Sequence, residues 1–547
     1  MSRANLVFYI NGKKHEVGGQ AAFQPLTDYL RYGQSLCGTK VVCAEGDCGA
    51  CTVLVGRART VGAPGFSYVP VNGCIQYLYQ LDGCHILTVE GVTGCQSDDA
   101  AACRLNPAQE AMVVENGSQC GFCTPGFIMS LSALAYCDYY KDYIGKDSLA
   151  EDSLANQTDS LKSALTGNLC RCTGYEAIVQ AAVSARYEQF QALSQVYDEQ
   201  AILKDLEPLL SVDVSVQWQD PGQSGPVKSG PAKSEPDQAA TTPLSQRQVF
   251  IPSSVASLCS YLAENPDAVL VSGGTDVSVN MNKREFKPLK LVSTARLGLD
   301  QLKQLDKDEL EKSGLVKLGL GKLGSGILKV GASVSLAQLE DYMKEACSEF
   351  YKILWVFGSP QIRHAGTLAG NIANGSPIAD SVPFLMLAQA SIEATSAQGT
   401  RLVPMSEFYL GYKKLALKPG EFISAVYIPM PVAQEKIKLY KVSRREHLDI
   451  SSFTAAFALQ IESGLIKQIR VVMGGMAATV MRLGEVENFL IGKPFKLETF
   501  KQAGKLAASS LAPLTDVRGS REYRLKLAEN IFSKLYHEIE EESLVKK

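Results

Sequence analysis

The chain has 547 residues, a formal net charge of −3 and 20% charged residues. Its length exceeds what one hydrophobic core normally serves, so we expect several domains. The absence of a basic excess argues against a nucleic-acid partner, and no apolar run reaches the ~18 residues of a membrane span. We therefore expect a cytoplasmic protein that binds neither nucleic acid nor membrane. In that reducing compartment, its 15 cysteines favour metal binding over disulfide bonds.

Residues 1–90 predict a small β-sheet that carries a metal centre. Strands are expected at Leu6–Ile10 and Lys14–Val17, because the Asn11-Gly12 pair between them is a strong hairpin signal. A C-x4-C-x2-C run and one later thiol follow, made of Cys43, Cys48, Cys51 and Cys74. This spacing is typical of a plant-type [2Fe–2S] cluster. A structural zinc site is the alternative, although it usually pairs two short cysteine hooks.

Residues 91–195 change to helical periodicity, with helices expected at Pro107–Asn116 and Gly126–Ala135. Two thiol pairs, C-x2-C and C-x-C, stand at predicted helix ends and comprise Cys120, Cys123, Cys170 and Cys172. Such pairs can complete tetrahedral ligation in a second cluster, but they are also a common zinc pattern. The spacing leaves both open. Residues 138–163, which separate the pairs, predict a solvated insertion.

Residues 196–247 predict a flexible linker, because their Pro, Gly, Ser and Gln content leaves too few apolar residues to pack. A third unit with alternating strands and helices follows at 248–430. It contains the run Leu270, Val271, Ser272, Gly273, Gly274, Thr275, Asp276 and Val277. This pattern predicts a strand that ends in a glycine turn. Such a turn can bring backbone N–H groups and a Thr oxygen against a phosphate, and the alternative is an ordinary turn, since strand–Gly-Gly turns are common.

A second stretch of small and polar residues, 366–380, indicates close approach of the backbone to a ligand, with loop crowding as the alternative. Residues 319–324 match G-x-G-x-x-G literally. A strand is expected after them where a dinucleotide site needs a helix, so they predict a hairpin turn. Residues 431–547 form a fourth unit, with strands at Ser452–Ile461 and Ile466–Met473 and helices from Leu497 onward.

Taken together, these motifs resemble the molybdenum hydroxylase family, specifically the iron–sulfur/FAD subunit of bacterial xanthine dehydrogenases. The resemblance rests on the two cysteine patterns, the Gly167–Tyr175 stretch and the 370–380 stretch, which occur in family order. It implies a multidomain α+β fold: a β-grasp plant-type ferredoxin domain, a four-helix [2Fe–2S]-binding domain, an α+β FAD-binding domain of the vanillyl-alcohol-oxidase/PCMH type and a C-terminal α+β flavoprotein domain.

The resemblance also implies roles for individual residues. The first four cysteines above hold one [2Fe–2S] cluster and the second four hold the other. Residues 270–277 contact FAD, and Asp449 lies near the nicotinamide side. Further FAD contacts are implied at Phe357, Thr367, Leu368, Ala369, Gly370, Asn371, Asp380, Ile423 and Lys441.

Family members hydroxylate hypoxanthine and xanthine to urate at a molybdenum centre, and the electrons pass through two clusters to FAD and then to NAD+. No stretch up to Lys547 resembles a molybdopterin-binding region. We therefore expect a separate molybdopterin subunit, in an α2β2 assembly. The alternatives are the equivalent subunit of a hydroxylase for aldehydes, nicotinate or carbon monoxide, and a zinc-stabilised scaffold without enzymatic function.

Overall fold

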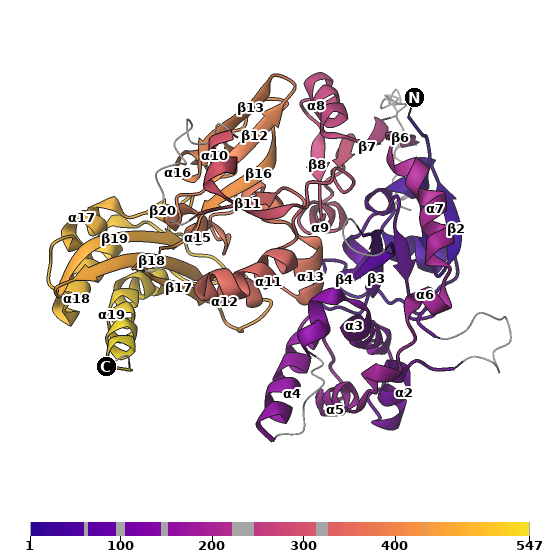
Figure 1. The fold of residues 1–547 in the computed structure, drawn as a ribbon, viewed down its shortest axis with the longest axis horizontal. Coiled ribbons are helices and arrows are strands. Elements are labelled where there is room, and N and C mark those ends of the chain that lie inside the picture. Colours follow the sequence, from indigo (N-terminus) through magenta and orange to yellow (C-terminus); the bar gives the residue numbers. More distant parts are fainter. Residues whose placement is uncertain are drawn as a thin grey trace, which may run out of the picture.

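The structure is a computed structural model that describes residues 2–59, 64–93, 104–143, 151–220, 245–312, 326–432 and 434–545. In Figure 1 the chain runs from a sheet and a helix bundle at the right, through a central unit, to a sheet backed by long helices at the left. The expected multidomain α+β architecture is confirmed. The turn predicted at 319–324 lies outside the described residues. Among the described helices, none combines the length and the apolar character that a membrane span needs.

The first unit is a five-stranded sheet of order β2-β1-β5-β3-β4. Its strands are β1 Leu6–Ile10, β2 Lys13–Val17, β3 Thr52–Ala58, β4 Phe66–Asn72 and β5 His85–Leu87. The predicted hairpin is confirmed, since Asn11 and Gly12 both have the positive φ that a tight two-residue turn needs. The cysteine-rich loop leads into β3, and Cys74 lies in the short 3-10 turn Gly73–Ile75 that follows β4.

The second unit is a bundle of helices beside this sheet (Figure 1), comprising α2 Pro107–Val114, α3 Thr124–Tyr136, α4 Glu151–Leu165 and α5 Glu176–Ser184. Every residue from Gly126 to Leu134 is buried, as befits the central helix of a bundle. The solvated insertion predicted at 138–163 is wrong for the C-terminal half of α4. Leu161, which falls in it, is 1% exposed and belongs to the same core as α3.

The predicted linker is also wrong over part of its length. Helix α6 Leu193–Val196 leads to α7 Glu199–Leu210, which buries Ile202 and Leu206, and strand β6 Val214–Asp220 pairs with the next unit. The composition of the segment concealed this apolar periodicity, because prolines and glycines dominate the residues after 220. Residues 221–244 lie outside the described part of the chain.

The third unit contains two larger sheets and a group of short helices. One sheet has the order β6-β7-β9-β8, with β7 Ser245–Ile251, β8 Val269–Val271 and β9 Lys290–Ser293. The other has the order β10-β11-β16-β12-β13, with β10 Leu302–Leu305, β11 Ile327–Gly331, β12 Ser391–Ser396, β13 Gly399–Pro404 and β16 Phe422–Pro429. A two-stranded ribbon is formed by β14 Tyr409–Gly411 and β15 Lys414–Leu415.

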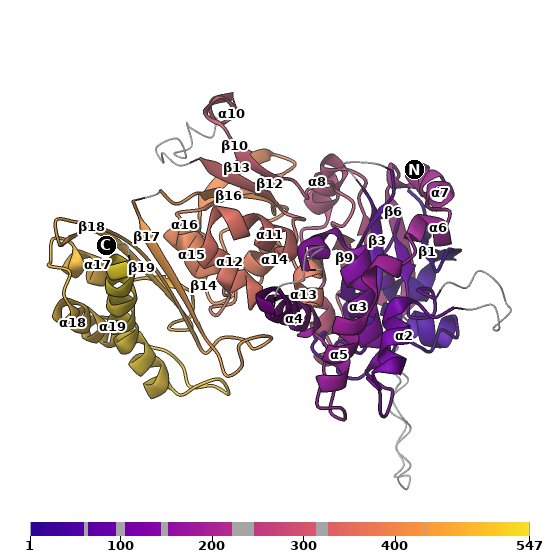
Figure 2. The same cartoon turned by 60° about the horizontal axis from the view of Figure 1, so that its bottom comes forward.

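The helices of this unit are α8 Val255–Glu264, α9 Val277–Lys283, α10 Lys307–Lys312, α11 Leu336–Ala346, α12 Ser348–Trp355, α13 Pro360–Ala365, α14 Leu368–Ala373, α15 Val382–Leu387 and α16 Met405–Phe408. In both views α13 lies where the third unit meets the first two (Figures 1 and 2). Its neighbours include β4 of the first sheet and α11 of its own unit. This short helix therefore connects the parts of the molecule that carry the predicted cofactor residues.

The fourth unit is a sheet of order β17-β18-β19-β20 with three helices. The elements are β17 Lys436–Val442, β18 Phe453–Glu462, β19 Leu465–Gly474, β20 Met481–Arg482, α17 Gly484–Leu490, α18 Leu497–Ser510 and α19 Arg521–Val545. The predicted strands and the helix start at Leu497 are confirmed. The core of this unit includes Phe457, Phe500 and Phe532, all fully buried between sheet and helices.

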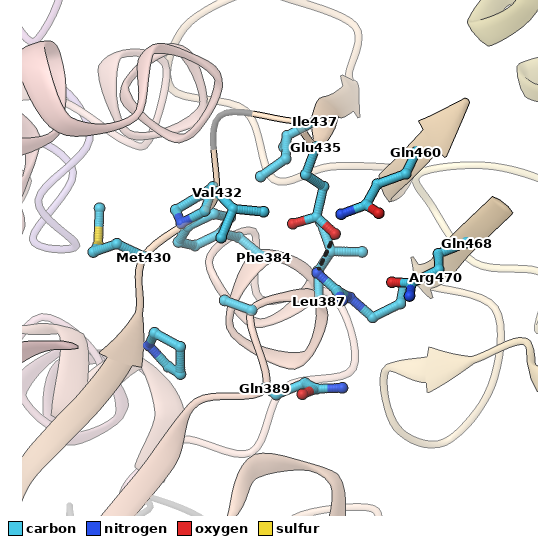
Figure 3. Close-up of a pocket in the computed structure, with 13 residues that line it drawn as sticks. Phe384, Leu387, Gln389, Met430, Val432, Glu435, Ile437, Gln460, Gln468 and Arg470 are labelled. Carbon is cyan, nitrogen blue, oxygen red and sulfur yellow. Dashed lines mark hydrogen bonds and ion pairs between the residues drawn. The ribbon is translucent and has the colours of Figure 1, made fainter. Parts of the chain in front are cut away.

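A pocket of about 190 Å³ opens where the third and fourth units meet (Figure 3). Phe384 and Leu387 of α15 form its apolar wall, and Arg470 of β19 pairs with Glu435 at 2.7 Å on its polar side. None of the predicted cofactor residues lines this pocket. The candidate cofactor sites lie elsewhere.

Candidate cofactor sites

The structure brings the first four cysteines together. Cys51 and Cys74 are buried, and Cys43 and Cys48 are partly buried on the loop that wraps over them. The backbone N of Cys48 donates to Cys43 Sγ at 3.5 Å. Hydrogen bonds from the Cys48 and Cys74 thiols lower the pKa of Cys43, and the same contacts raise the pKa values of its two partners. These sulfur atoms therefore share one compact site.

The second four cysteines also meet, at the ends of two helices. Cys123 is the residue before α3, and Cys170 and Cys172 precede α5. Cys172 Sγ lies 3.6 Å from Cys120 Sγ. Burial and a hydrogen bond with Cys170 raise the pKa of Cys123 to about 12. The two thiol pairs of the sequence thus form one group: Cys120 lies beside Cys172, and Cys123 lies beside Cys170.

Both groups offer sulfur donors only, and all eight cysteines are free of disulfide bonds. A thiolate set of this kind suits a [2Fe–2S] cluster, and it also suits zinc. Among the described residues, no three His, Cys, Asp or Glu side chains are placed to hold a single metal ion. The four thiols at each place supply the all-sulfur donor set of a [2Fe–2S] cluster, which shares its ligands between two irons.

The predicted phosphate loop lies against the start of the 366–371 segment. Ala365 O lies so close to Gly273 that a Cβ built on this glycine would be 1.7 Å from it, so only glycine fits there. Thr367 caps the N-terminus of α14, and its Oγ1 accepts a hydrogen bond from the N–H of Gly370 at 3.0 Å. Asn374 Nδ2 donates to Asp276 Oδ1 at 3.3 Å and joins the two segments. Two stretches about 90 residues apart in the sequence thus meet.

The remaining predicted flavin residues divide into a core group and a polar group. Leu368, Ala369 and Ile423 are buried in one apolar cluster, and Phe357 packs against it. Asp380 forms a buried ion pair with Lys441 of β17 at 2.9 Å. Lys441 Nζ also donates to the carbonyl of Val356 at 2.8 Å, next to Phe357. The third and fourth units therefore both contribute predicted flavin residues to one place.

Asp449 lies in the loop that follows β17. Its carboxylate pairs with Arg445 at 2.6 Å, and this contact lowers the pKa of Asp449. Burial raises the pKa of Asp47 in the first cysteine loop. The charge of Arg445 acts to lower this pKa, and the charge of Asp449 acts to raise it. The loop after β17 is therefore near the first cysteine group as well.

Three families of domains match the chain. The [2Fe-2S] binding domain matches residues 88–183, the FAD binding domain in molybdopterin dehydrogenase matches 245–431, and the CO dehydrogenase flavoprotein C-terminal domain matches 438–539. The three domains fit a [2Fe–2S]/FAD subunit of the molybdenum hydroxylase family. The chain is thus an electron-transfer module of the molybdenum hydroxylase type, with domains for [2Fe–2S] and FAD binding.

Relatives that are similar over nearly the whole of this chain include xanthine dehydrogenases and an aldehyde oxidase. The chain is 29% identical over 97% of its length to a xanthine dehydrogenase of Emericella nidulans, and 28% identical over 97% to xanthine dehydrogenase 1 of Arabidopsis thaliana. It is 27% identical over 97% to aldehyde oxidase 4 of Cavia porcellus. The chain spans only 38% and 39% of the length of the first two relatives and 39% of the third.

Among solved structures, a Cu,Mo-CO dehydrogenase chain matches with a TM-score of 0.46 and 25% identity. The match covers 52% of this chain and 94% of that chain. Quinoline 2-oxidoreductase from Pseudomonas putida 86 matches with the same TM-score and 25% identity, over 53% and 94% of the two chains.

Sequence reasoning missed the residues of α13 and their contacts. Gln361 reaches both cysteine-bearing units, and Ile362 packs against the first cysteine loop at Gly46. His364 meets the rings of Tyr139 and Tyr140 from the helical unit. No spacing in the sequence signals these contacts, because each α13 residue faces a different segment far away in the chain.

Proposed function

We propose that this chain is the electron-transfer subunit of a xanthine dehydrogenase. It receives electrons from the hydroxylation of hypoxanthine and xanthine at a molybdenum centre on a partner subunit. It delivers them to NAD+ through two [2Fe–2S] clusters and FAD. The observation that carries the proposal is that α13, which leads into the second predicted flavin loop, contacts both cysteine-bearing units. Ile362 packs against Cys51 and Cys74, and Gln361 bonds to Asn168, two residues before Cys170.

In this proposal, Cys43, Cys48, Cys51 and Cys74 hold one cluster, and Cys120, Cys123, Cys170 and Cys172 hold the other. When bound, each cluster would exchange one electron at a time, and FAD would exchange one or two. FAD can therefore link the one-electron clusters to a two-electron acceptor. The protein fixes the spacing and burial of these groups. Cys51 and Cys74 are shielded from water, since both are 2% exposed.

The flavin site is assigned to the two loops that meet at Gly273 and to the polar group at the domain junction. Residues 270–277 and 367–371 provide backbone N–H groups and the Thr275 hydroxyl for the pyrophosphate. Phe357 provides an aromatic face for the isoalloxazine ring. Asp380 and Lys441 hold that side of the site in place through their ion pair.

The second cysteine group is the proposed contact point for the molybdenum subunit in an α2β2 assembly. Cys120 and Cys172 are exposed, and the side chains of Phe122 and Tyr175 beside them are 45% and 39% exposed. Exposed aromatic residues are frequent in protein interfaces. This side therefore supports entry of electrons at the second group. The first group contacts the flavin-binding unit, since Asn282 Nδ2 of α9 donates to Cys74 O at 2.9 Å.

A second candidate is the same subunit of an aldehyde-oxidising hydroxylase. The similarity to aldehyde oxidase 4, at 27% identity over 97% of the chain, favours it, because that identity is close to those of the xanthine dehydrogenases. Both candidates require the same cofactors on this chain and differ in the substrate of the partner.

The test is purification of the chain with its native partner, followed by iron, flavin and molybdenum counts. We expect two [2Fe–2S] clusters and one FAD per chain, and NAD+ reduction that depends on xanthine. Turnover of an aldehyde without turnover of xanthine would select the second candidate. A colourless protein that contains zinc would overturn both.

A further inference from the structure

Gln361 of α13 places its side-chain amide at a point where three units of the protein meet. Its Nε2 lies 3.0 Å from Asn168 Oδ1 and 3.2 Å from both Thr52 Oγ1 and Ser130 Oγ. Thr52 belongs to the first sheet, and Ser130 and Asn168 belong to the helical unit. All four residues are at most 3% exposed. The amide is thus enclosed by polar groups from the two cysteine-bearing units.

The hydrogen-bond pattern requires a donor at this point. The Thr52 hydroxyl donates to Gly49 O at 2.6 Å, and the Ser130 hydroxyl donates to Asn168 Oδ1 at 2.7 Å. Each hydroxyl has one proton, so both oxygens can only accept from Gln361. The amide nitrogen of Gln361 has two protons, which three acceptors share: Thr52 Oγ1, Ser130 Oγ and Asn168 Oδ1. An apolar side chain would leave the buried Ser130 Oγ without a donor, and it would leave Asn168 Oδ1 and Thr52 Oγ1 with only the donors Ser130 Oγ and Asn168 Nδ2, respectively.

The same residues hold the two cysteine groups against each other. Asn168 Nδ2 donates to Gly49 O at 3.1 Å, and the next residue, Leu169, donates its N–H to Cys48 O at 3.0 Å. Leu169 is followed directly by Cys170. One hydrogen bond therefore links a cysteine of the first group to the residue beside a cysteine of the second.

Gly49 permits this approach. Its φ is +69°, and a Cβ built on it would lie 2.2 Å from Gly167 O. The two loops are in backbone contact, and a small shift of Asn168 would lengthen the Leu169–Cys48 bond.

We propose that Gln361 is a positioning residue for electron transfer between the two clusters. It holds Asn168, and through Asn168 it keeps the Leu169–Cys48 hydrogen bond and the spacing of the clusters. The transfer moves one electron and breaks no bond. The proposal rests on the proposed function, since it requires a cluster at each cysteine group. Gln361 belongs to the flavin-binding unit, yet in this proposal it controls the distance between the helical unit and the first sheet.

The test compares Gln361→Met and Ser130→Ala with wild type, in the full chain. Methionine matches glutamine in length and has no donor, and Ser130→Ala removes the second group that holds Asn168. Two readouts are used: the magnetic splitting between the two reduced clusters in low-temperature electron paramagnetic resonance, and hydrogen exchange of the peptide containing Leu169. We expect Q361M to lose splitting and to exchange faster at Leu169, with unchanged iron content. S130A should show the same changes to a smaller degree.

The matched control is Tyr139→Phe. Tyr139 OH donates to Glu340 Oε1 at 2.7 Å, so this change removes another hydrogen bond between the helical and flavin-binding units, away from the cysteine loops. We expect wild-type splitting in Y139F. The proposal is overturned if Q361M and S130A keep the wild-type splitting and exchange, or if Y139F alters them equally. Wild-type protein without iron would instead overturn the proposed function, before any variant is compared.

Discussion

Lys441 forms an ion pair with Asp380 that joins the C-terminal unit to the flavin-binding unit. Nζ lies 2.9 Å from Asp380 Oδ2, and the two side chains are 5% and 8% exposed. Lys441 also donates to Val356 O, and Ser451 donates to the same aspartate. The pair thus fixes the position of the backbone beside Phe357, which connects domain packing to the predicted flavin site.

We expect Lys441→Met to destabilise the protein and to weaken FAD retention. The change leaves the buried Asp380 carboxylate without its cation, and breaking a buried pair in this way costs about 3–5 kcal/mol. It also removes the donor to Val356 O. The measurements are the free energy of unfolding and the ratio of flavin to protein after gel filtration.

The control for this variant is Lys467→Ala, which breaks an exposed pair with Glu462 at 2.6 Å. An exposed pair contributes below about 1 kcal/mol, so stability and flavin content should stay near wild type. If K441M retained wild-type stability and flavin, the ion pair would have no part in the site.

Gly273→Ala should remove FAD binding. The new methyl group would lie 1.7 Å from Ala365 O, a backbone atom that cannot move without shifting the start of the second flavin loop. Overpacking of this kind costs about 1–3 kcal/mol. The expected result is loss of the yellow flavin absorbance while iron content is retained. Gly484→Ala is the control, because no atom lies within 4 Å of the added methyl; flavin in G273A equal to that in G484A would refute the assignment.

The sequence predicted those parts of the fold and site that depend on local patterns. The Asn11-Gly12 hairpin and the strands of the C-terminal unit are short-range features, and the cysteine spacings identified thiols that the structure brings together. Burial across domains was not predictable in this way. Leu161 of α4 and Ile202 of α7 lie in segments whose average composition is polar, so their apolar faces were missed. Gln361 carries no signal, because its partners come from residues 52, 130 and 168.

Cysteine substitutions should remove the two clusters independently. Cys51→Ser and Cys123→Ser each take one sulfur from a separate group, so iron should fall from about four atoms per chain to about two in either variant. One paramagnetic signal should remain in each, and the two remaining signals should differ. Cys37→Ser is the control, since Cys37 is exposed and lies outside both groups. Full iron content in C51S or C123S would show that the ligand assignment is wrong.

Stability should fall as the pH drops below about 6.5, and His364 should account for part of the fall. Burial lowers the pKa of His364 from 6.5 to about 3, and its Nε2 has no hydrogen-bond partner among the described residues. As the pH falls, the unfolded chain takes up a proton that the folded ring excludes. The stability from this group is therefore fully present above pH 6.5 and is lost progressively toward pH 3.

The slope from one such histidine is at most about 1.4 kcal/mol per pH unit. His364→Phe keeps a ring between Tyr139 and Tyr140 and has no titrating nitrogen. We expect the free energy of unfolding of H364F to depend less steeply on pH between about 5 and 6.5 than that of wild type. Some slope should remain, because burial also lowers the pKa of His85, to about 4. Identical slopes in both proteins would show that His364 is protonated as readily in the folded state as in the unfolded chain.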